Sequence, residues 1–233
     1  MIKRIFKLIG ILILIFLVSS LAGVVYYKMA PVEVTPLMLI RSVSPKGTPA
    51  QAEQEKHWEH RWVPYSEITP LMERAVRSSE DGRFYSHNGF DTIEIRHAME
   101  EAERGGKLRG ASTVSQQTAK NVFLWPGGGW FRKGLEAWFT VLIETVWGKE
   151  RIMEVYLNSI EMGPGIYGVQ AAAEHFFHTD AEHLTAEQCA LIVAALPNPI
   201  ERNVGNPSPY LKRRAARIRK YMKQQAPPPP STY

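Results

Sequence analysis

The sequence predicts an all-α domain preceded by a single membrane-spanning helix. Near the N-terminus an uncharged apolar run extends from Leu8 to Tyr27, about the length that a helix needs to cross roughly 30 Å of hydrocarbon. From Pro70 to Tyr221, apolar residues recur at intervals of three and four, the periodicity of helices that bury one face. No segment alternates convincingly between apolar and polar residues, so strands are not expected.

The apolar run has the flanks of a signal anchor. Three basic residues precede it, and an aromatic pair with a lysine follows it: Lys3, Arg4 and Lys7, then Tyr26, Tyr27 and Lys28. Because basic flanks stay on the cytoplasmic side, we expect residues 1–7 in the cytoplasm, 8–28 in the membrane and the remainder outside. A cleaved signal peptide, cut near Ser20 and Ala22, is the alternative, but the run exceeds the roughly 7–15 apolar residues of such a segment.

Residues 29–57 are predicted to form a connector outside the membrane. Prolines at 31, 36, 45 and 49 interrupt regular structure there, which predicts either an irregular stalk or a partly ordered hydrophobic connector. The apolar stretch Leu37–Ile40 lies either on the membrane surface or on the domain. We expect the compact domain at residues 58–225 and a proline-rich tail at 226–233.

Three helices in the second half of the chain have clear boundaries. The strongest pattern runs from Leu135 to Leu157, and Gly148 kinks or divides it. Another helix starts after Thr185, with Gln188 three residues on as the partner in a capping box. The last helix, residues 209–225, carries a dense positive charge that is either a solvated face or a surface for lipid headgroups.

Composition excludes several kinds of site. Cys189 is the only cysteine of the 233 residues, so the chain has neither an internal disulfide nor a cysteine-rich metal site, and its apolar neighbours predict a buried structural thiol. A zinc site at His175, His178 and His183 is a weak alternative, because His183 lies beyond a predicted turn. The net charge of +5 suits lipid headgroups, pyrophosphates and nucleic acid equally.

Three constellations carry chemistry. The first, residues 80–91, opens with the acidic pair Glu80 and Asp81, which is either a solvated pair or a reactive one. In the second, residues 110–121, Ser112 is expected to cap a helix whose N-terminus offers N–H groups to a phosphate. In the third, Arg132 and Glu136 lie four apart, so Glu136 is either an ordinary salt-bridge partner or a second catalytic carboxylate.

These blocks, with the stretch Tyr156–Asn158, resemble in order and spacing the peptidoglycan glycosyltransferase family over residues 65–220. One spanning helix and one domain, with no room for a transpeptidase, resemble its monofunctional members. The resemblance implies a two-lobed, lysozyme-like all-α fold with the small lobe near the membrane. It implies polymerisation of lipid II into glycan strands by inverting transfer, with release of the lipid pyrophosphate.

The resemblance also implies residue roles. Glu80 matches the general base that takes the proton of the acceptor 4-hydroxyl, and Glu136 matches the glutamate that assists the leaving group directly or through a divalent cation, Mg²⁺ or Mn²⁺. No organic cofactor is expected. The expected substrate-binding residues are Asp81, Phe84, His87, Ser112, Thr113, Gln116, Gln117, Lys120, Asn121, Arg132 and Lys133. For His87 a structural hydrogen bond is favoured over proton transfer.

The implied partners are lipid II, the growing lipid-linked glycan and membrane lipids, with division or elongation proteins in addition and no nucleic acid. The implied location is the cytoplasmic (inner) membrane, crossed once, with the catalytic domain outside the cytoplasm. The sequence departs from the family where Gly128 stands at a commonly basic position: either Arg132 and Lys133 compensate, or pyrophosphate binding is weaker and activity is lowered. Two rival functions remain: a lysozyme-like lytic enzyme, and a catalytically weak membrane-tethered scaffold of the wall-synthesis machinery.

Overall fold

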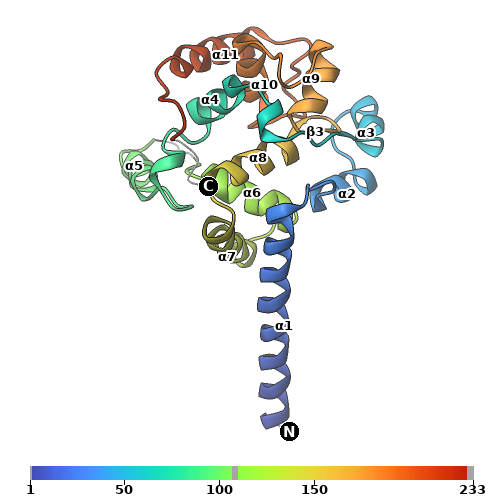
Figure 1. Cartoon of the computed structure of the whole chain (residues 1–233), viewed down its shortest axis with the longest axis vertical. Helices are drawn as coiled ribbons and strands as arrows, with labels where there is room; N and C mark the ends of the chain where they lie inside the picture. Colours follow the sequence, from blue (N-terminus) through green and yellow to red (C-terminus); the bar gives the residue numbers. More distant parts are fainter. Residues whose placement is uncertain (1, 107–109, 230–233) are drawn as a thin grey trace.

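The computed structural model describes residues 2–106 and 110–229, and it consists of a helical domain attached to one long helix (Figure 1). Helix α1 (Ile2–Met29) is long and apolar enough to cross a membrane, and little of its apolar stretch is buried by the rest of the chain. The signal-anchor prediction therefore matches a continuous helix. Of the proline-rich tail expected at 226–233, residues 230–233 lie outside the described part.

The elements after α1 follow one another closely. In chain order they are α2 (Pro36–Val43), α3 (Pro49–Lys56), β1 (Glu59–His60), η1 (Tyr65–Glu67), α4 (Pro70–Ser79), η2 (Phe84–Ser86), α5 (Thr92–Glu103), α6 (Val114–Phe123), α7 (Trp130–Val146), α8 (Lys149–Ser159), β2 (Glu161–Gly163), β3 (Ile166–Tyr167), α9 (Val169–Phe177), α10 (Ala186–Ala195) and α11 (Pro209–Met222). The domain is thus mostly helical, as predicted.

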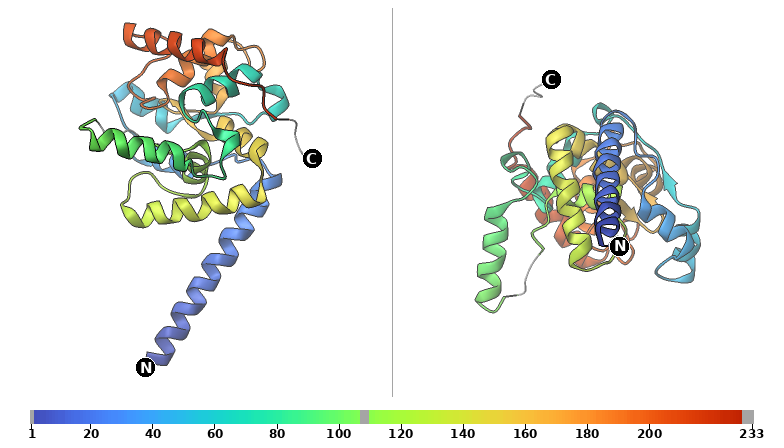
Figure 2. Two further views of the ribbon diagram at one scale, coloured as in Figure 1. Left: turned by 90° about the vertical axis from the view of Figure 1, so that its left-hand side faces the viewer. Right: turned by 90° about the horizontal axis from the view of Figure 1, so that it is seen from below.

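The helices gather into two groups. Helices α4, α10 and α11 pack on one another at the end of the domain far from α1, whereas α6, α7 and α8 pack together next to α1 (Figures 1 and 2). This arrangement agrees with the two lobes that the family resemblance implies. The predicted division of the strongest helical pattern is confirmed: α7 and α8 are separated at Gly148, whose φ of 77° is one that glycine adopts without strain.

The connector is not an irregular stalk, and that prediction is wrong. Pro36 and Pro49 occupy the first turns of α2 and α3, with Thr35 and Thr48 as the N-caps. Proline is favourable there, because the first N–H groups of a helix have no partner within the helix. Buried Arg41 on α2 forms ion pairs with Glu161 and Glu55, so the two helices are part of the domain.

The structure contains a small sheet that the sequence did not predict. Its strand order is β1-β3-β2, with β1 parallel and β2 antiparallel to β3. Strands of two or three residues are too short to display an alternating pattern. The turn between β2 and β3 requires Gly165 (φ 67°), because a Cβ there would lie 2.5 Å from the carbonyl oxygen of Gln54.

Helix α1 is docked on the domain by hydrogen bonds as well as by apolar contact. Trp138 Nε1 donates to Ser20 Oγ at 3.1 Å, and Trp147 Nε1 donates to the Val24 carbonyl at 2.7 Å. Arg151 Nη2 then reaches the C-terminal end of α1, donating to the carbonyls of Tyr27 (2.8 Å) and Ala30 (2.5 Å). These last carbonyls of a helix otherwise lack a partner. The long N-terminal helix is therefore hydrogen-bonded to the domain at several points along its C-terminal half.

The docked part of α1 belongs to the apolar run, so α7 beside it must lie close to the bilayer. The first residues of α7 support this, since Trp130 is 93% and Phe131 75% exposed. Exposed aromatic side chains of this kind are enriched at membrane–water interfaces. We therefore expect the helix that carries Glu136 to lie near the level of the lipid headgroups.

We expect Trp147→Phe to lower the free energy of unfolding by about 2 kcal/mol, because the Val24 carbonyl loses its donor and the smaller ring leaves a void. Thermal unfolding in detergent micelles should show a melting temperature lower by roughly 5 °C. Trp130→Phe is the matched control, since that side chain is almost fully exposed. Equal melting temperatures for the two variants would contradict the docking role of Trp147.

Candidate active site

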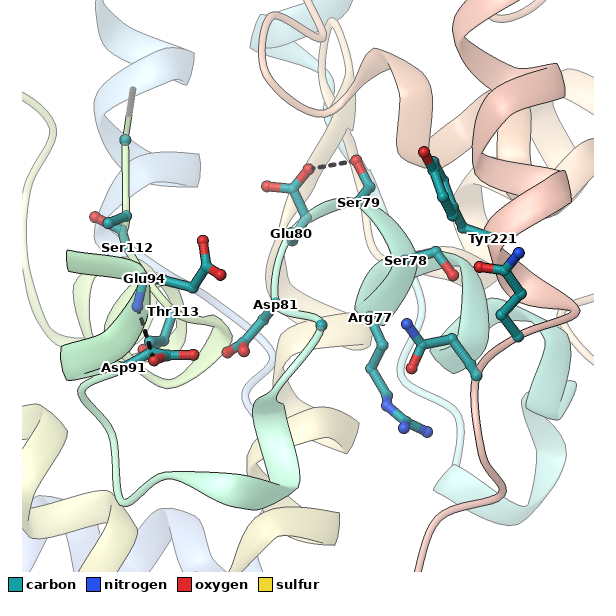
Figure 3. Close-up of a pocket in the computed structure, with 15 residues that line it drawn as sticks. Arg77, Ser78, Ser79, Glu80, Asp81, Asp91, Glu94, Ser112, Thr113 and Tyr221 are labelled. Atoms are coloured by element: carbon teal, nitrogen blue, oxygen red, sulfur yellow. Dashed lines mark hydrogen bonds between the residues drawn. The ribbon is translucent and has the colours of Figure 1, made fainter. Parts of the chain in front are cut away.

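Glu80 is held in a defined orientation at the end of α4. Its Oε1 accepts a hydrogen bond from Ser79 Oγ at 3.0 Å, and its Oε2 accepts from Gln117 Nε2 on α6 at 3.4 Å. Gln117 is in turn oriented by the buried Tyr156 hydroxyl, which donates to Gln117 Oε1 at 3.4 Å. The carboxylate borders an open cavity of about 330 Å³ (Figure 3). Gln117, predicted to bind substrate, thus also positions Glu80.

Asp81 and His87 are buried beneath this cavity and bind each other. His87 Nε2 lies 3.0 Å from Asp81 Oδ1, and His87 Nδ1 accepts from the Gly89 N–H at 3.2 Å. Because Nδ1 is the acceptor, the ring carries its hydrogen on Nε2 and donates it to Asp81. The other Asp81 oxygen accepts from the Val114 N–H at 2.9 Å. These contacts agree with the structural role expected for His87.

Asp91 also stabilises the loop between α4 and α5 by hydrogen bonds through both of its oxygens. One of its oxygens accepts from the N–H groups of Ile93 and Glu94, which caps α5, and the other accepts from Arg83 at 3.0 Å. Burial opposes ionisation of Asp91, but the two N–H donors and the Arg83 charge outweigh it and lower the pKa of the carboxyl group. Asp91 therefore stays ionised as a cap.

The start of α6 differs from the prediction. Thr113, not Ser112, is the N-cap: its Oγ1 accepts from the Gln116 N–H, and Gln116 Oε1 accepts from the Thr113 N–H. Gln116 is buried and committed to this capping box. The Val114 N–H donates to the Asp81 carboxylate, so the N-terminus of α6 already binds a negatively charged side chain of the same protein. A phosphate at this N-terminus, as the sequence suggested, would have to displace it.

Positive charge gathers around Glu136 instead. This buried carboxylate accepts from Arg132 Nη1 at 2.9 Å through one oxygen and from Lys133 Nζ through the other. Lys133 Nζ also lies 3.4 Å from the exposed Ser112 hydroxyl at the cavity rim. Burial lowers the pKa of Lys120 on α6; the charge of Glu136 opposes this shift, and those of Arg132 and Lys133 add to it. Three cations thus surround one carboxylate and leave a positive excess.

This donor set does not fit a divalent cation held by the protein. Both Glu136 oxygens are bound by cationic side chains. Within residues 2–106 and 110–229, the one cluster of three potential metal ligands is Asp81, His87 and Asp91, whose atoms are engaged in the hydrogen bonds described above. Mg²⁺ or Mn²⁺ therefore stays a prediction tied to the pyrophosphate of the substrate, and no step below depends on it.

Two further residues predicted to bind substrate, Phe84 and Asn121, differ in their exposure. Phe84 is fully buried under Lys149, whose Nζ lies 4.5 Å from the ring centroid, so in this structure it supports the loop, and its contact with substrate stays a prediction. The cause of the burial is packing, because the ring fills the core below the loop. Asn121 follows Lys120 on α6 and remains partly exposed. The weak zinc alternative gains nothing, since His175 and His183 each contact a carboxylate of their own, Glu59 and Asp180.

The sequence analysis did not predict that Ser79 and Arg214 help to orient Glu80. Arg214 Nη2 on α11 donates to Ser79 Oγ at 3.1 Å, so the hydroxyl that orients Glu80 is itself held by a residue from the far group of helices. Because Ser79 is adjacent to Glu80 in the sequence, a hydrogen bond between them could have been predicted. Arg214 stands among many basic residues of a helix far along the chain, and nothing in that pattern distinguishes it.

Gly128 lies in the turn before α7, against Arg132. Its φ is 84°, and a Cβ there would lie 3.0 Å from Arg132 Cβ. A basic side chain at this position would therefore be strained in this loop conformation. Arg132 and Lys133 supply positive charge within five residues of it.

An anchored all-α domain whose cleft combines an oriented carboxylate with a cluster of cations has the parts of a glycosyltransferase that uses a phosphorylated donor. The transglycosylase family matches residues 46–223, and the chain belongs to that family.

Relatives in several bacteria cover nearly the whole chain. A biosynthetic peptidoglycan transglycosylase of Bacteroides thetaiotaomicron is 53% identical over 221 residues, which is 95% of this chain and 88% of the relative. Proteins of the same name from Bdellovibrio bacteriovorus (51% over 206 residues; 88% and 81%) and Pseudomonas aeruginosa (43% over 226 residues; 96% and 95%) are also similar. The match includes the N-terminal part of the chain as well as the domain.

We expect Gly128→Lys to destabilise the protein by about 1 kcal/mol, because a side chain must adopt a left-handed backbone conformation there. Gly134→Lys is the matched control: this glycine lies within α7 without a left-handed φ, and no atom lies within 4 Å of a Cβ at that position. Chemical denaturation of both variants in detergent measures the difference. A Gly128→Lys protein as stable as the wild type would show that the loop conformation is not constrained.

Proposed function

We propose that this protein polymerises lipid II into peptidoglycan glycan strands by inverting glycosyl transfer at the outer face of the cytoplasmic membrane. The observation that carries the proposal is the division of the site: a carboxylate oriented at an open cavity on one side, and a positively charged cluster around Glu136 on the other. The family membership and the names of the relatives support the same activity.

Glu80 is the proposed general base. The 4-hydroxyl oxygen of the acceptor sugar attacks the anomeric carbon of the donor, and Glu80 takes the hydroxyl proton as the new carbon–oxygen bond forms. The bond between the anomeric carbon and the lipid pyrophosphate breaks on the opposite face, so an α-linked donor gives a β-linked product. The hydrogen bonds from Ser79 and Gln117 fix the carboxylate without protonating it.

The leaving group needs positive charge more than it needs a proton, because a pyrophosphate is a stable anion. Lys120, Arg132 and Lys133 are the proposed stabilisers of the charge that develops on it. Glu136 then has an indirect role: it orients Arg132 and Lys133 through direct hydrogen bonds and keeps these like charges together. Ser112, within reach of Lys133, borders both parts of the site.

The membrane geometry favours a lipid-linked donor. Helix α7 carries Glu136, Arg132 and Lys133 beside the docked anchor, so the cationic cluster lies near the headgroup level where a lipid pyrophosphate is found. With the basic N-terminus on the cytoplasmic side, the domain would face the periplasm or the cell exterior. Division or elongation proteins remain proposed partners on this face.

The site supports the two rival functions, a lytic enzyme and a scaffold, less well than it supports polymerisation. A lytic enzyme cleaves finished glycan and has no pyrophosphate to bind, so three cations around Glu136 would serve no purpose in it. A scaffold has no need of a carboxylate oriented through both oxygens. The glycine at position 128, which raised the scaffold alternative, has Arg132 and Lys133 near it.

The direct test is polymerisation of purified lipid II by the detergent-solubilised protein, with and without Mg²⁺ or Mn²⁺. The wild type should form polymer. Glu80→Gln should lower kcat by at least about 100-fold, because the base is lost at constant size, and Glu136→Gln should lower it through loss of the cation arrangement. Glu150→Gln, an exposed glutamate on α8, is the matched control and should retain activity.

Two outcomes would contradict the proposal. A folded wild type that forms no polymer under any condition would favour the scaffold alternative. Cleavage of finished glycan by the wild type, lost in Glu80→Gln, would favour the lytic one.

The lowered pKa of Lys120 predicts a pH dependence. A lysine of lowered pKa loses its charge at a lower pH than an ordinary lysine, so kcat/KM, which reports the free enzyme, should decline early on the alkaline side. In Lys120→Arg this decline should move to higher pH, because arginine stays protonated. Lys212→Arg, outside the cleft on α11, is the control. The same alkaline profile in wild type and Lys120→Arg would exclude Lys120 as the titrating group.

A further inference from the structure

The wall of the cavity opposite the start of α6 is formed by the C-terminal end of the described chain. Tyr221, in the last turn of α11, and Gln224 and Gln225 after it line the same cavity as Glu80 and Asp81. Figure 3 shows Glu80 between Ser112 on one side and Tyr221 on the other. Neither the family resemblance nor the proposed mechanism gives these three residues a role.

This C-terminal wall is fastened to the helix that carries the base. Arg214 on α11 donates to Ser79, and Ile218 and Met222 bury their side chains in the core. Beyond α11, the chain turns back along α4, where Arg77 Nη1 donates to the Ala226 carbonyl at 3.0 Å. The segment 221–226 is therefore held before and after the residues that line the cavity.

Arg77, which holds the Ala226 carbonyl, is itself held in place by several contacts. Arg77 is buried, pairs with Glu73 at 3.2 Å one turn earlier on α4, and lies 4.9 Å from the Tyr85 ring centroid. Tyr65 and Tyr85 both donate to Glu73. Burial and the Glu73 charge raise the pKa of both tyrosines, so they stay protonated donors. A network of this kind fixes the position of the C-terminal wall relative to Glu80.

The chemistry of the cavity suits a neutral sugar. Tyr221, Gln224 and Gln225 present a phenol and two amides, which can donate to and accept from hydroxyl and N-acetyl groups. The other lining residues include four carboxylates, those of Glu80, Asp81, Asp91 and Glu94, and one cation, Arg77, whose charge is already paired with Glu73, so the cavity disfavours a phosphate. Lys120, Arg132 and Lys133 do not line this cavity. A pyrophosphate therefore fits beyond Ser112, and a sugar ring fits here.

We propose that Tyr221, Gln224 and Gln225 form a sugar-binding subsite that holds an N-acetylated sugar of the glycan next to the reacting bond. The inference rests on the proposed polymerase function and adds a subsite to it. Tyr221 is 46% exposed, which leaves its ring available to pack against a sugar face. By retaining the glycan between successive transfers, this subsite sets the length of the strands.

Binding is measured first, without turnover. The probe is a tetrasaccharide of β-1,4-linked N-acetylglucosamine, a neutral N-acetylated glycan without lipid or pyrophosphate, titrated into the full-length protein in detergent. The double variant Gln224→Ala/Gln225→Ala should bind it about 10-fold more weakly, because two or more hydrogen bonds are lost, and Tyr221→Ala should weaken it similarly. Tyr210→Ala is the matched control, since Tyr210 is 52% exposed at the other end of α11, outside the cavity.

Strand length is measured second, by polymerisation of lipid II. The subsite variants should form shorter strands than the wild type and raise KM more than they lower kcat, while Tyr210→Ala should match the wild type. Equal probe affinity and equal strand length in all variants would overturn the subsite and leave the polymerase function standing. A wild type that forms no polymer would refute the polymerase function, and the probe titration would then still report on the subsite.

Discussion

The cleft depends on one buried carboxylate, that of Asp81. It binds His87 within its own loop and the Val114 N–H at the start of α6, two segments that are far apart in the sequence. This contact brings Gln117 of α6 opposite Glu80, so the orientation of the proposed base follows from it. Removing a buried charge partner usually costs several kcal/mol, because the remaining polar groups lose their hydrogen bonds. The residue beside the base is therefore the one that assembles the site.

The site separates charge in a way that suits its two tasks. On the Glu80 side the cavity is lined by carboxylates, neutral polar groups and the paired Arg77, which suits the proposed base and the proposed sugar subsite. On the Glu136 side a single buried carboxylate holds Arg132 and Lys133, which suits the proposed stabilisation of negative charge on the leaving group. Preorganised charge is effective in catalysis because it needs no rearrangement during the reaction. Ser112 stands at the boundary between the two sides.

The anchor contributes to the architecture as well as to attachment. Hydrogen bonds from Trp138, Trp147 and Arg151 join α1 to α7 and α8. Because α7 also carries Glu136, these hydrogen bonds connect the cationic cluster directly to the apolar helix. The connector helices reinforce this arrangement, since Arg41 of α2 is buried against Glu161 of the domain.

The sequence alone determined the features that depend on local pattern. Helical periodicity, the division at Gly148, the capping box at Thr185 and the acidic pair at Glu80 and Asp81 are written in neighbouring residues, where spacing and capping chemistry act. Tertiary structure decided the rest. It made Thr113, and not Ser112, the N-cap of α6, and it buried Phe84. It also folded the proline-rich connector into α2 and α3 and placed Arg214 and the C-terminal wall near Glu80. These outcomes depend on contacts between distant segments, and no local pattern records which segments will meet.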